Sequence, residues 1–189
     1  MGSEMCIRDR HLDLHENATR GHILDTVLNA MDEAKRASYD DIVNHAVIPD
    51  KHHHSIVEVR ESIDALEVPE QVKEDLHAVY EILAAAEASV HGCAVEETHF
   101  HEVGNASGIR NALAICAAFY VLAPEAVVAT PLQTGEGEIE CAHGLLSLPA
   151  PATAAIIEGL PVAEDKLPGE RCTPTSAAII KHFVTSFEG

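Results

Sequence analysis

The sequence predicts a mixed α/β domain with a helix-rich N-terminal half and at least one βαβ unit. Three segments before residue 92 carry apolar residues at the spacing of an amphipathic helix. Later in the chain, an almost wholly apolar segment at 107–122, typical of a buried helix, lies between candidate strands at 98–104 and 126–130. Strand, buried helix and strand in this order indicate a parallel βαβ unit.

The composition limits the classes of protein to which this chain can belong. The chain has 189 residues, of which 47% are hydrophobic, so we expect a single domain over residues 11–189 with a sizeable core. Residues 1–10 follow no periodic pattern and are predicted to be a non-native or disordered leader. With 31 acidic against 12 basic residues, the formal net charge is −19, which disfavours binding to nucleic acids and to anionic membranes.

Two further features point to a cytoplasmic protein. No apolar run reaches transmembrane length. The five cysteines are scattered and show no CxxC spacing, which argues against a disulfide framework or a structural zinc site. A reducing cytoplasm is therefore the predicted location.

The N-terminal half is predicted as a strand followed by helices. His11 to His15 form a short strand, and residues 20–36 have the apolar spacing of one helix. Residues 37–54 are polar and connect to the next helix, which Ser55 opens as the first residue of a capping box. A long helix is then predicted from Pro69 to a terminating glycine at 92.

The C-terminal half is predicted to contain a hairpin and two helices. Residues 133–148 resemble a hairpin, and the segment 149–153 leads into a short helix that ends near Gly159. Thr173 caps a final helix that runs to about Phe187.

The strongest candidate for chemistry is the segment 98–104, Thr-His-Phe-His-Glu-Val-Gly. On a strand, alternate side chains share one face, so Glu97, His99 and His101 would point the same way. Imidazole binds nickel, zinc, copper and iron, and Glu97 or Glu102 could complete a ligand set. The alternatives are a strand whose polar face meets solvent and a histidine that forms a hydrogen bond in the core.

Two other groups of histidines and cysteines suggest chemistry. His52, His53 and His54 precede a helix start and could bind a metal loosely, and the alternative is a solvated tract. Cys141 and His143 lie near a turn, where a nucleophilic cysteine would need a base in contact. A buried cysteine with a histidine that belongs to the turn or contacts a ligand is the simpler interpretation.

The segment around Thr173 is a candidate anion site. Thr173 and Thr175 load a helix N-terminus with hydroxyls, and Arg171 is adjacent. The free N–H groups and the dipole of such an end favour a phosphate or a carboxylate. The alternative is an ordinary N-cap.

Several motifs together resemble one family. The segments KHHHS, ETHFHEVG, TPLQTGEG, CAHGLLSLPAPAT and ERCTPTSAAIIK occur in this order over about residues 50–185. In this combination they resemble the LarC-type nickel insertion proteins. The resemblance implies a lyase-type nickel chelatase, which inserts Ni²⁺ into pyridinium-3,5-bisthiocarboxylic acid mononucleotide in a CTP-dependent reaction. It also implies Mg²⁺ or Mn²⁺ with the CTP. The sequence leaves open a homo-oligomer and a C-terminal portion that is encoded separately.

The resemblance assigns roles to matching positions. The residues it implies for catalysis, in the HFHE and CAHG motifs, are His99, His101, Glu102 and His143. The residues it implies for binding the nucleotide cofactor are Thr173, Thr175 and Arg171. The implied metal ligands are His99, His101, His52, His53 and His54.

The sequence departs from the family pattern at expected carboxylates. Ser107 and Asn111 stand where the family usually has acidic residues, and His22 replaces another near the N-terminus. Fewer hard oxygen ligands would weaken the binding of Mg²⁺ or Mn²⁺. Two hypotheses follow: the N-terminal part of a nickel insertion enzyme, or a divergent non-catalytic relative that binds metal or ligand or serves as a subunit of a larger assembly.

Overall fold

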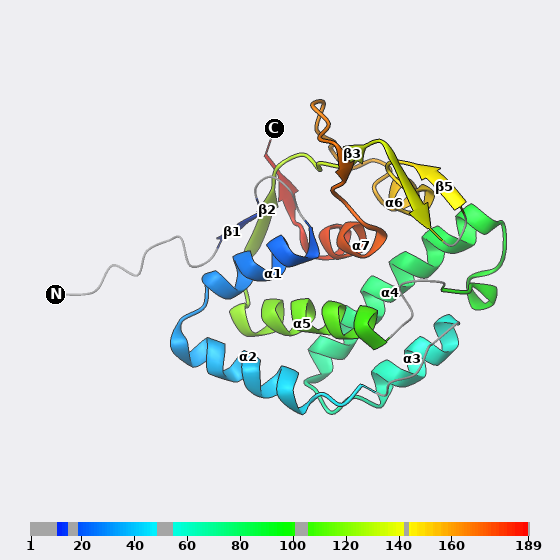
Figure 1. The fold of residues 1–189 in the computed structure, drawn as a ribbon. Helices are drawn as coiled ribbons and strands as arrows, with labels where there is room; N and C mark the ends of the chain where they lie inside the picture. Colours follow the sequence, from blue (N-terminus) through cyan, green and yellow to red (C-terminus); the bar gives the residue numbers. More distant parts are fainter. Residues whose placement is uncertain (1–10, 15–18, 49–54, 101–105, 142–143, 189) are drawn as a thin grey trace.

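A computed structural model of the chain describes residues 11–14, 19–48, 55–100, 106–141 and 144–188 (Figure 1). The helices are α1 (Arg20–Asn29), α2 (Glu33–His45), α3 (Ile56–Asp64), α4 (Glu70–His91), α5 (Ala106–Leu122), α6 (Pro151–Ile156) and α7 (Pro174–Phe183), with the 3-10 helix η2 at Val95–Glu97. The strands are β1 (His11–Leu14), β2 (Ala126–Ala129), β3 (Gly135–Glu136), β4 (Glu138–Cys141), β5 (Gly144–Ser147), β6 (Gly169–Glu170) and β7 (Ser186–Phe187). Among the described residues, no helix has the length and apolar character needed to cross a membrane.

A parallel sheet of three strands, in the order β1-β2-β7, confirms the α/β class. Leu12 pairs with Val127, and both side chains are buried. Helices pack beside this sheet (Figure 1). The predicted partner of β2 at 98–104 was wrong for its described part, in which His99 forms only an isolated antiparallel bridge with Ser55. The hydroxyl of Thr98 donates to the Ala84 carbonyl of α4 at 3.5 Å, which ties this segment to a helix and away from the sheet.

Helix α4 is the centre of the core. It contacts α3, α5, α6 and α7, and in Figure 1 it passes behind α5. The predicted apolar stripe is confirmed at five positions with 0–1% exposure, namely Val72, Leu76, Val79, Tyr80 and Leu83. Val90, near the C-terminal end of the helix, is 41% exposed and does not belong to the core.

The predicted single helix at 20–36 is divided in two. Helix α1 ends at Asn29, and the Asp32 carboxylate accepts a hydrogen bond from the Lys35 N–H at 2.8 Å to cap α2. Residues 37–45, predicted as part of a polar connection, are helical because Tyr39 anchors α2 with only 7% exposure. The local N-cap therefore outweighs the continuous apolar spacing.

The C-terminal half follows the prediction with two differences. Strands β4 and β5 form the predicted hairpin, but Gly135 of β3 pairs with Glu170 of β6. Helix α7 begins after the predicted cap Thr173 but ends at Phe183, before the predicted end. The reason is long-range, since the Thr185 N–H donates to the Val127 carbonyl at 2.8 Å and so directs the chain into the sheet as β7.

Candidate functional site

A cavity of about 290 Å³ brings together three helices that begin on the same side of the molecule, α1, α5 and α7 (Figure 1). Its lining consists of Thr19, Arg20, Gly21, Leu24, Asn111, Ile115 and Thr173. Two of the three helices present their first residues to this cavity. Helix N-termini carry unsatisfied N–H groups and a partial positive charge, so the arrangement suits a negatively charged ligand.

The start of α1 contributes donors to the cavity. Thr19 is the N-cap, and its hydroxyl accepts a hydrogen bond from the His22 N–H at 3.3 Å. The first bond of the helix backbone runs from Ile23 N to Thr19 O at 2.9 Å. This leaves the N–H groups of Arg20 and Gly21 without a partner among the described residues.

The start of α7 has the predicted cap. The Thr173 N–H donates to the Ser176 hydroxyl at 2.8 Å, and the Ser176 N–H donates to the Thr173 hydroxyl at 3.3 Å. Thr173, predicted to contact a nucleotide, lines the cavity. Thr175, with the same predicted role, is 3% exposed and does not line it.

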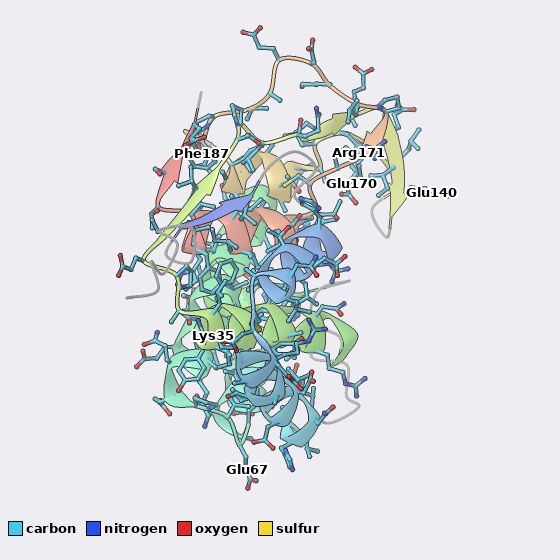
Figure 2. The ribbon with its side chains drawn as sticks, turned by 90° about the vertical axis from the view of Figure 1, so that its left-hand side faces the viewer. Lys35, Glu67, Glu140, Glu170, Arg171 and Phe187 are labelled. Carbon is cyan, nitrogen blue, oxygen red and sulfur yellow. The ribbon has the colours of Figure 1, made fainter. Side chains whose placement is uncertain are left out.

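Arg171, the third predicted nucleotide contact, lies away from the cavity lining. Its Nε donates to the Pro168 carbonyl at 3.0 Å. Figure 2 shows Arg171 beside Glu170, at the end of the molecule that carries Glu140 of the β4–β5 hairpin. Its predicted role in nucleotide binding stays a prediction.

Of the predicted metal ligands, the structure describes His99, whose side chain is exposed. His52, His53, His54, His101, Glu102 and His143 lie outside the described residues, and their predicted roles are not tested. Described residues that flank these segments nevertheless form two contacts. Ser55 pairs with His99, and Ile48 accepts a hydrogen bond from Arg110 of α5 at 3.5 Å.

These two contacts involve described residues that flank the histidine segments in the sequence. Ile48, which precedes residues 49–54, bonds to Arg110 of α5, and Ser55, which follows them, pairs with His99. Ala106, which follows residues 101–105, begins α5. Within the described part of the chain alone, no three His, Cys, Asp or Glu side chains converge to hold a metal ion.

Cys172, which precedes the N-cap of α7, has an unreactive thiol because of its surroundings. The side chain is 1% exposed, and burial raises the pKa of its thiol to about 11 from an ordinary value of 9.0. Because the folded state holds the proton more tightly, the stability linked to this group is complete below about pH 9 and is lost as the pH rises toward 11. A nucleophilic role for Cys172 at neutral pH is thereby excluded.

We expect iodoacetamide at about pH 8 to modify Cys93 at least about tenfold faster than Cys172 in the native protein. Cys93 is partly exposed, whereas Cys172 is buried and protonated. Peptide-resolved mass spectrometry over a time course measures both rates, and unfolding in urea supplies the reference in which both thiols are accessible. Similar native rates would contradict the buried placement of Cys172.

The comparisons with known proteins agree with the motif pattern. A model of the family described as "Nickel insertion protein" matches residues 10–189. The chain belongs to the nickel insertion protein family. This confirms the family predicted from the sequence and places nearly all of the described structure within it.

Three relatives illustrate the similarity within the nickel insertion protein family. The "Pyridinium-3,5-bisthiocarboxylic acid mononucleotide nickel insertion protein" of Staphylococcus epidermidis is 40% identical over 136 residues, 72% of this chain and 34% of the relative. The protein of the same name from Geobacillus kaustophilus is 36% identical over 155 residues, 79% of this chain and 38% of the relative. The "Putative nickel insertion protein" of Geobacter metallireducens is 42% identical over 135 residues, 71% of this chain and 35% of the relative.

The match covers more of this chain than of its relatives. The chain spans about a third of the length of the curated nickel insertion proteins it matches. No solved structure matches.

The sequence alone did not identify all of the residues that line this cavity. No motif singled out Arg20 or Gly21 as site residues, and only the capping position of Thr19 before a helical segment gave a local signal. Asn111 was noted because it replaces an expected carboxylate, and the structure adds that it lines the cavity.

Proposed function

We propose that this chain takes part in the insertion of Ni²⁺ into pyridinium-3,5-bisthiocarboxylic acid mononucleotide. The observation that carries the proposal is membership of the nickel insertion protein family over residues 10–189. The bridge between Ser55 and His99 supports it, because Ser55 directly follows the tract His52 to His54 in the sequence and His99 belongs to the other predicted ligand segment. Nickel is a substrate in this reaction.

The donor chemistry suits a protein that releases the metal it binds. His99, His101 and the tract His52 to His54 offer imidazole nitrogens, which bind nickel well. The name of the relatives' substrate includes two thiocarboxylic acid groups, whose sulfur atoms are softer donors. A few imidazoles would hold Ni²⁺ loosely enough to pass it to sulfur. Since only neutral imidazole binds a metal, protons compete with nickel for these nitrogens.

We expect the double variant His99→Ala/His101→Ala to bind Ni²⁺ at least about tenfold more weakly than the unmodified chain, because each imidazole is a proposed metal donor. Isothermal titration calorimetry with Ni²⁺ alone measures the affinity. The experiment requires neither the pyridinium substrate nor CTP.

A matched control removes two histidines elsewhere. His45 bonds to the Asp41 carbonyl at 2.7 Å, and His77 contacts the Asp64 carboxylate at 2.8 Å, so both already have partners on the helical surface. The variant His45→Ala/His77→Ala is expected to retain the affinity of the unmodified chain. Equal affinity in the His99/His101 variant and in the unmodified chain would remove these residues from the proposed metal site.

The second candidate function is a non-catalytic relative that binds metal or ligand or serves as a subunit of a larger assembly. It is favoured by Asn111, which supplies an amide to the cavity where the family resemblance leads us to expect a carboxylate. His22, in the first turn of α1, likewise stands at an expected acidic position. Absence of CTP-dependent nickel transfer in the complete reconstituted protein, with Ni²⁺ binding retained, would favour this alternative.

The finer expectations belong to the same proposal. They are the use of CTP with Mg²⁺ or Mn²⁺, catalytic roles for Glu102 and His143, and nucleotide contacts from Thr173, Thr175 and Arg171. A cytoplasmic location, a homo-oligomer and a separately encoded C-terminal portion are also proposed. Thr173 has the most support among the nucleotide contacts, because it lines a cavity together with the start of α1.

A further inference from the structure

Among the described residues, the lining of the cavity among α1, α5 and α7 includes several hydrogen-bond donors and no acidic side chain. This contrasts with the whole chain, in which 31 acidic residues outnumber 12 basic ones. The polar lining comprises Thr19, Arg20, Asn111 and Thr173, with a backbone contribution from Gly21. In a strongly acidic protein, a cavity whose described lining carries one charged residue, an arginine, is an electropositive spot that favours an anion.

Arg20 is the decisive residue in this cavity. Its side chain is partly buried, and within the described part of the chain it forms no ion pair or hydrogen bond. The other described arginines have partners: Arg36 reaches Asp40, Arg60 binds Glu81 with two bonds, and Arg110 and Arg171 each bond to a carbonyl. A partly buried guanidinium without a counter-charge is costly, and a bound anion would remove that cost.

The apolar lining and the volume of the cavity further limit the kind of ligand that fits. Leu24 and Ile115 give the lining an apolar part, and Ile115 is 1% exposed. Its volume of about 290 Å³ is at the lower end of the range for small-molecule sites. A ligand with a compact anionic head and an apolar or aromatic remainder fits such a site better than a free inorganic ion.

We infer that this cavity binds the phosphate of a mononucleotide directly through Arg20 and the start of α1, without a metal ion between phosphate and protein. The guanidinium offers a planar pair of N–H donors, and the N–H groups of Arg20 and Gly21 add to them. Arg20 and Gly21 thereby become phosphate-binding residues beside the predicted Thr173. The inference rests on the proposed function only for the class of ligand, a pyridinium mononucleotide.

The test measures binding of nicotinic acid mononucleotide, a pyridinium nucleotide, by isothermal titration calorimetry in the presence of EDTA and without nickel. Nicotinic acid riboside, which lacks the phosphate, is the matched ligand. We expect the mononucleotide to bind at least about tenfold more tightly than the riboside, since the phosphate makes charge-assisted hydrogen bonds. Equal binding of the two ligands, or no binding of the mononucleotide, would overturn the inference.

Two variants locate the binding in the cavity. Arg20→Gln removes the guanidinium charge, and Asn111→Asp adds a carboxylate of nearly the same shape at an exposed position of the lining. Each is expected to weaken mononucleotide binding by about tenfold or more. Arg36→Gln is the matched control, because it removes the same charge from an exposed position on α2 and should retain the affinity.

Circular dichroism and thermal unfolding establish that each variant is folded. Affinity that is unchanged in Arg20→Gln or in Asn111→Asp, or that falls equally in Arg36→Gln, would contradict the assignment. Failure here is distinguishable from failure of the proposed function, because this titration contains no nickel, whereas the His99/His101 titration contains no nucleotide.

Discussion

Replacing Leu83 by alanine is expected to lower the free energy of unfolding by about 2–5 kcal/mol. Leu83 is fully buried on α4, the helix that contacts α3, α5, α6 and α7. Truncation removes apolar contacts and leaves a cavity in the closely packed core, where little relaxation can fill the space. For a domain whose total stability is about 5–15 kcal/mol, this is a large share.

Urea unfolding monitored by circular dichroism measures the effect of Leu83→Ala. The midpoint should fall while the dependence on urea concentration stays the same, as expected for a loss of stability without a change in the folded state. Leu145→Ala is the control, since this leucine on β5 is 64% exposed and should cost less than about 0.5 kcal/mol. A loss for Leu83→Ala no larger than that for Leu145→Ala would contradict the central position of α4.

The second large effect is expected for Gly135→Ala, with a loss of about 3–5 kcal/mol from combined steric overlap and backbone strain. A Cβ atom at Gly135 would lie 1.9 Å from the Gly169 carbonyl oxygen and 3.0 Å from Arg171 N, and the residue has a φ of +83°. Both obstacles are backbone atoms of the neighbouring β6 segment, which cannot rotate away. The β3–β6 pairing must therefore separate.

Gly137→Ala separates the two causes. Gly137 also has a positive φ, of +113°, but a Cβ there would have no atom within 4 Å. We expect this control to lose only about 1–3 kcal/mol, from backbone strain alone. Chemical unfolding of both variants under one set of conditions measures the difference, and equal losses would show that contact with β6 does not matter.

The contact between Gly135 and β6 is also expected to affect the cavity that Thr173 lines. Strand β6 ends at Glu170, and the chain continues through Cys172 directly into the Thr173 cap. Displacement of β6 should therefore move Thr173, so Gly135→Ala is expected to weaken mononucleotide binding as well as stability. Gly137→Ala should leave that affinity nearly unchanged.

The parts of the fold that could be predicted are those with local causes. Ser55 and Glu58 form both bonds of the predicted capping box, and Gly92 ends α4 with a φ of +66° as its position indicated. The apolar stripes of α3 and α4 were also recognisable, because helical periodicity repeats within a few residues. The same local reasoning failed at Asp32, where a cap divides an apolar pattern that looks continuous.

The parts that could not be predicted depend on contacts between distant segments. The pairing of β1 with β2 joins residues near 12 and 127, and a four-residue strand carries no local mark of its partner. Segment 98–104 had the alternation expected of a strand, and Thr98 and Phe100 are indeed buried while His99 is exposed. Its described part lacks a neighbouring strand because η2 and α4 hold it beside the helices.

In the candidate site, too, some features have local causes and others depend on contacts between distant segments. By itself, the sequence determined the family, the cap at Thr173 and the imidazole-rich segments, since motifs and caps are defined by residues close together in the chain. The tertiary structure alone decided that Arg20, Asn111 and Thr173 share one cavity, and that Ser55 meets His99. These neighbours come from different helices, and the packing of α1, α5 and α7 around the core brings them together, because burial of apolar faces selects one arrangement of the whole chain.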